Sequence, residues 1–138
     1  MNKQETAEKV VNTMFENDYF SQWLGIERVL VEPGKCILKM KIRKEMLNGF
    51  SIAHGGIAYS LADSALAFAS NSHGRKSLSI ETSISHTESL QEGDTIFATA
   101  GEINLSNKLG IYYISVTKED KTVALFRGTV YRTSKEWF

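Results

Sequence analysis

The sequence contains only one cysteine and one proline among its 138 residues. A single cysteine, Cys36, excludes an internal disulfide framework and is typical of a protein kept in a reducing compartment. Apolar residues alternate around Cys36, which predicts a thiol buried in a core strand rather than a reactive one. The one proline, Pro33, is followed by Gly34, and this pair suits a tight turn between two strands.

The chain also lacks an excess of charge and a long apolar run. Sixteen basic residues balance sixteen acidic ones, so there is no broad basic field for a nucleic acid. No segment approaches the ~20 apolar residues of a membrane span, and the charged amino terminus is unlike a signal peptide. We therefore expect a cytoplasmic protein with one domain over 1–138 and neither nucleic acid nor membrane as a partner.

Hydrophobic periodicity divides the chain into strand-rich flanks around one central helix. An amphipathic helix is expected over about 4–16, followed by a turn in which a second short helix is an alternative. Two segments of strand character precede the central helix as a hairpin and four follow it, at 26–32, 35–43, 77–87, 94–103, 109–118 and 122–133.

The central helix is expected from Gly55 to Asn71. It lies within the stretch 47–74, whose only formally charged residue is Asp63. Apolar residues cover almost the whole circumference of this helix, which is typical of a buried helix, and its alanines keep it thin. The sequence therefore predicts an α+β fold in which an antiparallel sheet wraps around a long central helix, with an amphipathic helix at the amino terminus.

Asp63 is costly to keep ionised on a buried helix without a partner. One interpretation places it at a subunit interface, where it accepts hydrogen bonds from the backbone or from hydroxyl groups such as those of Ser60 and Ser64. The other interpretation makes it a catalytic carboxylate whose reactivity is set by a dry site.

His54, Gly55 and Gly56 stand at the start of the central helix. Glycine lets a backbone approach a ligand closely, and the first turn of a helix gathers unsatisfied N–H groups and the positive end of the helix dipole. A carbonyl oxygen placed there is polarised, and the charge that develops on it during attack is stabilised. Two glycines before a helix are also common turn chemistry, so this motif gains its weight from Asp63.

The spacing of Gly55 and Asp63 restricts how the two can act together. Eight residues of helix correspond to a rise of about 12 Å, whereas the attacking group and the hydrogen-bond donor must each lie about 3 Å from the reacting carbonyl. One chain cannot bring both groups to the same carbonyl. We therefore expect Gly55 of one subunit to work with Asp63 of another.

Two polar residues near this motif have both a structural and a functional interpretation. His54 either orients the loop through hydrogen bonds of its ring or takes part in proton transfer or substrate contact. Asn48 either forms a turn with Gly49 or holds a water or a carbonyl with its amide. A metal site is not expected, because the other two histidines lie at unsuitable spacing and no second carboxylate joins them.

Three motifs together resemble one known family. The segment "MLNGFSIAHGGIAYSLADSALAFASNSHG" at 46–74 is followed by Gly93-Asp94 and by "KTVALFRG" at 121–128. In this order they resemble the hotdog-fold acyl-CoA thioesterases of the phenylacetate-degradation type (PaaI-like), and the likeness extends from about residue 15 to about residue 132. The resemblance implies a hotdog fold, active sites at dimer interfaces, a homodimer as the minimal unit and usually a homotetramer.

The resemblance also implies roles for individual positions. Asp63 would be the nucleophile or general base toward a thioester, and the Gly55 N–H would polarise the thioester carbonyl. Asn48 and His54 would line the opposing half of the site. The candidate contacts for the coenzyme A arm are Gly56, Asn71, Lys108 and Arg127.

The sequence departs from the family pattern at Glu88 and Ser89, where an Arg-Pro pair is frequent. Either Glu88 is a solvated loop residue, or the contacts to the nucleotide shift to other basic side chains. The basic residues available for such contacts are Arg75, Lys76 and Lys108.

The leading functional hypothesis is hydrolysis of an acyl-CoA thioester with an aromatic (phenylacetyl-like) or medium-length acyl group. The acyl pocket would be lined by small and aromatic side chains, namely Ala58, Tyr59, Ala62 and Phe68. No cofactor is expected beyond the coenzyme A of the substrate. Two alternatives stay open: a hotdog-type dehydratase or hydratase with His54 as its main base, and a non-catalytic acyl-CoA-binding module.

Overall fold

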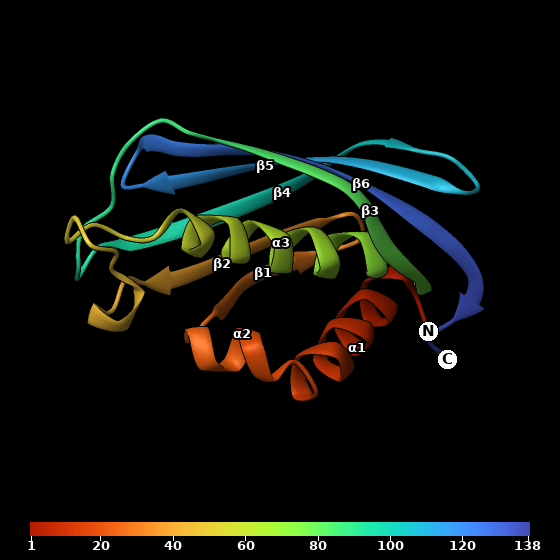
Figure 1. Ribbon diagram of the computed structural model, residues 1–138. Helices are drawn as coiled ribbons and strands as arrows, with labels where there is room; N and C mark the ends of the chain where they lie inside the picture. Colours follow the sequence, from red (N-terminus) through yellow and green to blue (C-terminus); the bar gives the residue numbers. More distant parts are fainter.

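A curved sheet and the helix that it encloses form the body of the molecule. The computed structural model describes residues 1–138. Helix α3 (Gly55–Asn71) lies against the sheet, and α1 (Lys3–Glu16) and α2 (Tyr19–Leu24) lie beyond it on the side away from the sheet (Figure 1). The strands are β1 (Glu27–Glu32), β2 (Lys35–Lys41), β3 (Arg75–His86), β4 (Thr95–Leu105), β5 (Leu109–Lys118) and β6 (Lys121–Glu136), and a short 3-10 helix spans Lys44–Met46.

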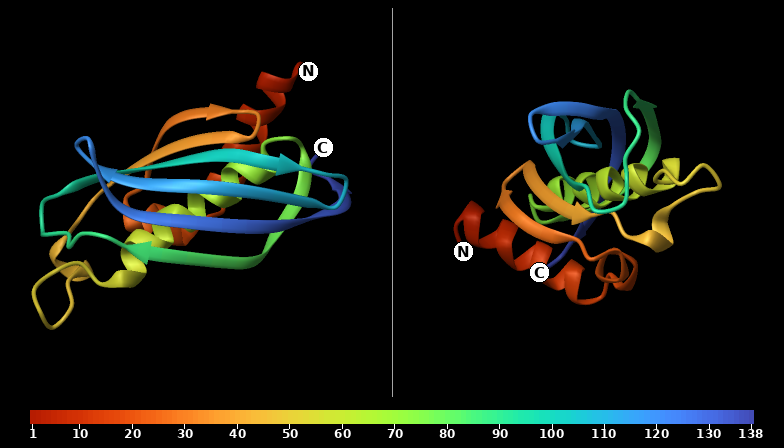
Figure 2. Two further views of the ribbon diagram at one scale, coloured as in Figure 1. Left: turned by 90° about the horizontal axis from the view of Figure 1, so that it is seen from above. Right: turned by 90° about the vertical axis from the view of Figure 1, so that its left-hand side faces the viewer.

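The sheet is antiparallel throughout, with the spatial order β1-β2-β4-β5-β6-β3. Strands β1 and β3 therefore form its two edges. Viewed end-on, the sheet curls around α3 (Figure 2). Along β2, β5, the first half of β4 and much of β6 every second residue is buried, as expected of a sheet with one face on the core. The predicted α+β architecture and order of elements are confirmed.

Helix α3 begins and ends at the residues expected from the sequence. Its side chains in the core are mostly small, which allows the sheet to come close: Ala58, Leu61, Ala62, Ala65, Leu66, Phe68 and Ala69. The approach is close at Gly128 of β6, where a Cβ atom would lie 2.5 Å from Leu66 Cδ2. Only glycine fits at this point without displacing Leu66.

Helix α1 is the expected amphipathic helix. Its first turn is capped by Asn2, whose Oδ1 accepts a hydrogen bond from the Glu5 N–H at 2.8 Å, as is usual for an N-cap asparagine. Val10 and Val11 are fully buried. Near its end, the ring of Phe15 meets Phe68 of α3 edge to face, with 6.3 Å between the ring centroids. These contacts attach α1 to the side of α3 that the sheet does not cover.

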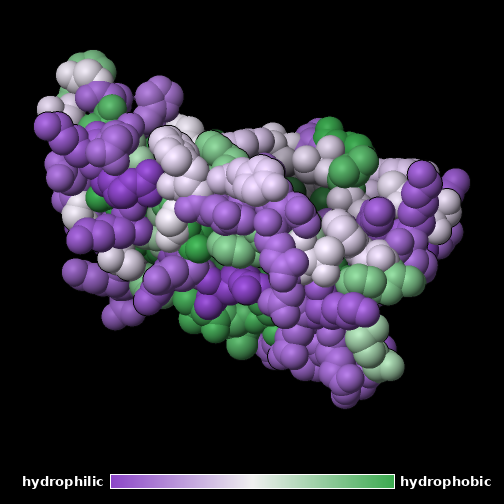
Figure 3. Space-filling model, turned by 90° about the horizontal axis from the view of Figure 1, so that it is seen from below, coloured by the Kyte–Doolittle hydropathy of each residue, from purple (hydrophilic) through white to green (hydrophobic).

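Helix α2 confirms the alternative of a second short helix after α1. Asp18 caps it by accepting a hydrogen bond from the Ser21 N–H at 3.0 Å, and Gly25 ends it in the left-handed conformation. Three aromatic side chains of α2 are exposed, those of Tyr19, Phe20 and Trp23. On the face seen from below, hydrophilic surface surrounds separate apolar clusters (Figure 3). No helix of the protein is long and apolar enough to cross a membrane.

Cys36 is buried in β2, which confirms the expected core thiol. Burial raises the pKa of this thiol to about 12, although the charge of Arg28 acts in the opposite direction. The thiolate, which is the reactive form, is therefore scarcely populated near neutral pH.

Replacing Gly128 with alanine should destabilise the fold, because the new methyl group forces Leu66 to move within a packed core. We expect a loss of about 1–3 kcal/mol in the free energy of unfolding. The matched control is Gly101→Ala in β4, where a Cβ atom would have nothing within 4 Å. Denaturant melts of both variants check this, and equal stabilities would contradict the close contact.

Candidate active site

Helix α3 is less completely covered than its apolar composition predicted. Gly56, Ser60, Asp63 and Ala67 are exposed or only partly buried, and their spacing of four, three and four residues places them along one face. The sheet and α1 cover this face only in part. The expectation of a buried helix therefore holds within the subunit for most of its circumference, and composition does not tell cover by the same chain from cover by another.

The first turn of α3 leaves one backbone N–H group free. The Gly56 N–H donates to Nδ1 of His54 at 3.2 Å, and the Ile57 N–H donates to the His54 carbonyl at 2.9 Å. The Gly55 N–H has no acceptor in the chain. A free N–H at the positive end of a helix dipole is suited to a carbonyl oxygen or an anion.

The loop before α3 is held by backbone hydrogen bonds on both sides. The Ala53 N–H donates to the Leu90 carbonyl and the His54 N–H donates to the Met46 carbonyl, both at 2.8 Å. His54 acts as the N-cap through its ring, which is the structural interpretation of this residue. Because Nδ1 accepts the hydrogen bond from Gly56, the proton of the neutral ring lies on Nε2.

Asn48 also fulfils its structural interpretation. Its Oδ1 accepts hydrogen bonds from the Phe50 N–H at 2.8 Å and from the Ile52 N–H at 3.4 Å. These bonds close the turn that carries the loop back toward α3, as asparagine does in many turns. Its amide NH₂ makes no hydrogen bond within the chain, and the residue lines a pocket.

That pocket, with a volume of about 330 Å³, collects three of the predicted site residues at the N-terminus of α3. Asn48, His54 and Gly55 line it together with residues of the segment after β3. The full set is Asn48, Ile52, Ala53, His54, Gly55, Ala58, His86, Thr87, Glu88, Ser89 and Leu90. Asp63 is not among them.

Asp63 lines a separate cavity of about 370 Å³ further along α3. This cavity is more apolar and is shared by α1, α3, β3, β6 and the end of the chain; its lining is Met14, Asp63, Leu66, Ala67, Ser70, Asn71, Lys76, Ser77, Leu78, Ser79, Val130 and Trp137. The two pockets have no residue in common. One subunit therefore holds the two predicted halves of the site apart, as the spacing of Gly55 and Asp63 requires.

The carboxylate of Asp63 makes no hydrogen bond within the chain. Ser60 donates instead to the Gly56 carbonyl at 2.7 Å, and Ser64 pairs with Ser21 at 2.8 Å, so the hydroxyl partners suggested by the sequence are engaged elsewhere. Burial raises the pKa of Asp63, and the nearby charge of Asp18 raises it further. A partly buried carboxylate with a raised pKa and no hydrogen-bond partner is typical of a reactive group.

The four residues suggested for coenzyme A lie in different places. Gly56 follows Gly55 in α3 but does not itself line the first pocket. The amide of Asn71 is buried, and it bonds to the backbone of Ala67 and Ser77 and to Trp137 Nε1. Because these bonds occupy the amide, a contact with coenzyme A at Asn71 is disfavoured.

Lys108 and Arg127 lie away from both pockets of the subunit. Lys108 is exposed in the turn between β4 and β5 and adjoins Arg75 and Arg132. Arg127 points away from α3, since it alternates with Gly128, which contacts Leu66. Its guanidinium lies 3.7 Å from a carboxylate oxygen of Glu81. Any contact of Arg127 with a ligand in these pockets would therefore have to involve a neighbouring subunit.

The proposed acyl-pocket lining is only partly supported. Ala58 adjoins the first pocket, and Tyr59 is half-buried with its hydroxyl against that of Thr82 at 2.5 Å. Ala62 and Phe68, in contrast, are fully buried within the subunit. They face the core and α1, so they cannot line a pocket between two helices.

Two residues that the sequence did not single out belong to the site. Asp18 caps α2 and acts electrostatically on Asp63. His86, at the end of β3, lies against Gly55, with Nε2 at 3.4 Å from the position of a Cβ atom there. Only the alternation of β3 could have indicated the direction of His86, and nothing in the sequence places its ring at the start of α3.

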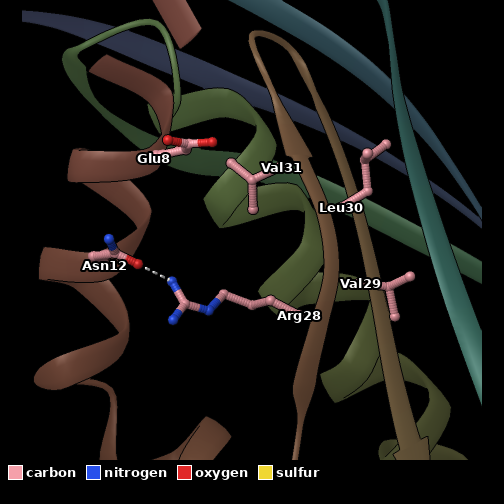
Figure 4. Close-up of a pocket in the computed structure, with 6 residues that line it drawn as sticks. All are labelled: Glu8, Asn12, Arg28, Val29, Leu30 and Val31. Carbon is pink, nitrogen blue, oxygen red and sulfur yellow. Dashed lines mark hydrogen bonds between the residues drawn. The ribbon is translucent and has the colours of Figure 1, made fainter. Parts of the chain in front are cut away.

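A third cavity, of about 320 Å³, lies between α1 and β1 and has a different character. Arg28 reaches across it from β1 and donates a hydrogen bond to Asn12 of α1 at 2.5 Å (Figure 4). Its guanidinium also lies over the ring of Phe15. These contacts fix α1 to the sheet edge and offer no attacking group. No three His, Cys, Asp or Glu side chains gather as a metal site.

The sequence and the fold correspond to one superfamily of enzymes. The thioesterase superfamily model matches residues 50–125, which include His54, Gly55 and Asp63 but not Asn48. The chain belongs to the thioesterase superfamily and is a thioester hydrolase of the hotdog fold.

Within this superfamily, the chain is similar to individual proteins over most of its length. The acyl-coenzyme A thioesterase PaaI of Escherichia coli is 38% identical over 122 residues, which cover 88% of this chain and 87% of the relative. The solved structure of E. coli PaaI matches with a TM-score of 0.95 at 34% identity, covering 98% of this chain and 99% of that one. A variant of PaaI from Thermus thermophilus matches with a TM-score of 0.82 at 37% identity, covering 84% and 100%. The resemblance to PaaI-like proteins is confirmed.

Replacing Asp63 with asparagine should stabilise the protein at neutral pH. The raised pKa means that the folded state holds the proton of Asp63 more tightly than the unfolded state, so stability falls as pH rises between the two pKa values. Asparagine removes this penalty. We expect the variant to melt at a higher temperature than the wild type near neutral pH, and the difference should vanish in acid.

Asp94→Asn is the matched control, for which we expect the opposite change in stability. Burial would raise the pKa of Asp94, but the hydrogen bond from the Gln91 N–H and the contact with Lys118 lower it overall. The stability that Asp94 contributes is therefore present above the unfolded-state pKa and lost as pH falls through the folded-state pKa. Thermal melts from about pH 3 to about pH 8 compare all three proteins. If Asp63→Asn melts at a lower temperature than the wild type at neutral pH, this would contradict the expected cost in stability of the Asp63 carboxylate.

Proposed function

We propose that the protein hydrolyses acyl-CoA thioesters, with an aromatic (phenylacetyl-like) or medium-length acyl group as the preferred substrate. The observation that carries this proposal is the pairing of a free N–H at Gly55 with an unpartnered carboxylate at Asp63 on the same helix. The first suits the thioester carbonyl and the second suits the attack. The name of the E. coli relative supports acyl-CoA as the substrate class, and a Streptococcus mutans structure of this fold, 25% identical with a TM-score of 0.78, is described as bound to acetyl CoA.

The subunit interface proposed for this reaction runs along β3 and α3. β3 is an edge strand, and its Leu78 and Ile80 side chains are 67% and 60% exposed, which invites pairing with another strand. A two-fold axis that pairs β3 with itself makes the strands antiparallel, and it sets the two α3 helices antiparallel as well. The N-terminus of one helix then moves toward the middle of the other. This arrangement supports a site built from Gly55 and from Asp63 of the partner subunit.

Within this site the substrate carbonyl accepts a hydrogen bond from the Gly55 N–H. In one route, Asp63 of the partner subunit takes a proton from water as the water oxygen attacks the carbonyl carbon. In the other route, the carboxylate itself attacks and forms an anhydride that water later cleaves. In both, collapse of the tetrahedral intermediate breaks the C–S bond and releases the coenzyme A thiolate, which takes up a proton. The first route leaves the free acid directly, whereas the second leaves the anhydride, whose hydrolysis releases the free acid and restores the carboxylate of Asp63.

The dehydratase or hydratase hypothesis is weakened by the state of His54. That hypothesis requires the imidazole as the main base, but the lone pair on Nδ1 accepts the hydrogen bond from Gly56, and the proton therefore lies on Nε2. The binding-module hypothesis is set aside by membership of a hydrolase superfamily. Neither alternative explains an unpartnered carboxylate at Asp63.

Mixing two inactive variants tests the shared site. Asp63→Asn should lower kcat by about 10³-fold while substrate binding is largely kept, because the attacking carboxylate is lost. Gly55→Val should also be inactive, since its side chain obstructs the carbonyl position. In a hybrid dimer, one site combines the intact Gly55 of the first variant with the intact Asp63 of the second. Unfolding and refolding the mixture should restore about a quarter of the wild-type activity.

The controls are each variant refolded alone and wild type taken through the same procedure. The assay follows thiol release from phenylacetyl-, hexanoyl- and palmitoyl-CoA. If the mixture stays as inactive as its components while wild type recovers, the two residues do not act across subunits. Wild type without activity on any of these substrates would sink the proposed reaction itself.

A further inference from the structure

We propose that His86 is a further catalytic residue, which donates a second hydrogen bond to the thioester carbonyl beside the Gly55 N–H. This inference rests on the proposed function, because it concerns the same carbonyl. The site lacks a second hydrogen-bond donor. A developing oxyanion is usually held by more than one donor, and the first turn of α3 offers only one.

The first turn of α3 offers only one donor because its other N–H groups already make hydrogen bonds within the turn. The Gly56 N–H is bound by His54 Nδ1 at 3.2 Å, and the Ile57 N–H is bound by the His54 carbonyl. Neither can turn toward a substrate without uncapping the helix. A second donor must therefore come from outside α3.

The register of β3 directs His86 toward this point. His86 pairs with Ala124 and Ile84 pairs with Phe126, and Ala124 and Phe126 are buried on the concave face of the sheet. Because side chains opposite each other in a sheet share a face, His86 points toward α3. Strand β3 ends at this residue, so the ring stands at the level of the start of the helix.

The geometry allows one oxygen to reach both donors. His86 Nε2 lies 3.4 Å from the position of a Cβ atom on Gly55, and that position is about 2.5 Å from the Gly55 nitrogen. The two nitrogens are therefore at most about 6 Å apart, which is close to twice the usual N–H···O distance of about 2.9 Å. An oxygen between them accepts from both, and any side chain at residue 55 would intrude on its place.

The ring of His86 is available for this role. It makes no hydrogen bond or ion pair within the chain, although it lines the same pocket as His54 and Asn48. The nearest acid in sequence, Glu88, also lines the pocket, but its carboxylate is engaged by Lys121 at 2.9 Å. The tautomer with its proton on Nε2 presents an N–H to the carbonyl.

Two substitutions separate the hydrogen bond from the shape of the ring. His86→Phe keeps a planar ring and removes the donor, whereas His86→Gln keeps an N–H donor near the position of Nε2. We expect kcat for phenylacetyl-CoA to fall about 10²-fold in His86→Phe, with KM and melting temperature little changed, and to recover in large part in His86→Gln. Ser85→Ala, on the outward face of the same strand, is the control and should keep wild-type kcat.

A binding measurement tests His86 independently of turnover. Phenacyl-CoA carries a ketone joined to sulfur through a methylene group, so it presents a carbonyl but has no thioester to hydrolyse. With a ¹³C label at this carbonyl, a donated hydrogen bond moves its resonance downfield on binding. We expect the shift to be smaller in His86→Phe than in wild type, and to return in His86→Gln.

The outcomes distinguish this inference from the proposed function. One outcome is that wild type hydrolyses acyl-CoA while His86→Phe leaves both kcat and the carbonyl shift unchanged. This would overturn the role of His86 and leave the proposed hydrolysis intact. A carbonyl shift that depends on His86, without turnover of any acyl-CoA, would keep the role of His86 and reject the hydrolysis. Failure of wild type both to hydrolyse acyl-CoA and to bind the probe would reject both.

Discussion

The close packing of α3 against the curved sheet is the constraint on which the rest of the structure depends. At Gly128 the two elements approach so nearly that no side chain fits, and the alanines of α3 allow the same approach elsewhere. A helix held this firmly keeps its first turn in one place relative to the end of β3 and the loop after it. The position of the free Gly55 N–H is thus a product of core packing, since a loop alone could not fix it within the tolerance that catalysis requires.

The same packing explains why the site must be divided. A straight helix of seventeen residues carries Gly55 and Asp63 on one rigid rod, and no loop movement can bring them together. Their side of the helix is the side that the chain covers only in part. In the proposed reaction, the partner subunit packs along this side and the chemistry takes place there.

Much of this arrangement could be predicted from the sequence because local signals agreed. The bounds of α3 followed from His54 before the helix and from the polar turn after Asn71, and the strands followed from alternation and turn residues. The cap formed by His54 and the turn formed by Asn48 were among the expected alternatives. These features depend on residues close together in the chain, so a pattern of a few residues contains the information.

Features that depend on distant segments could not be predicted in the same way. In β3 a bulge lies between Ser79 and Glu81, so the alternation changes face along the strand, and a period-two pattern read through it would bury the exposed Leu78. The contact of His86 with Gly55 depends on the same strand and on its pairing with β6, which no local pattern specifies.

Asp63 shows why such a site costs stability. Its carboxylate is drawn from water by the surrounding side chains, it has no donor to offset that loss, and Asp18 adds repulsion. A neutral residue would serve the fold better at this position. The helix could have met its packing needs with another alanine, so packing does not account for the one charged group on this face. In the proposed reaction, the group that complements Asp63 is the attacking water or the thioester of a bound substrate, which the free enzyme lacks.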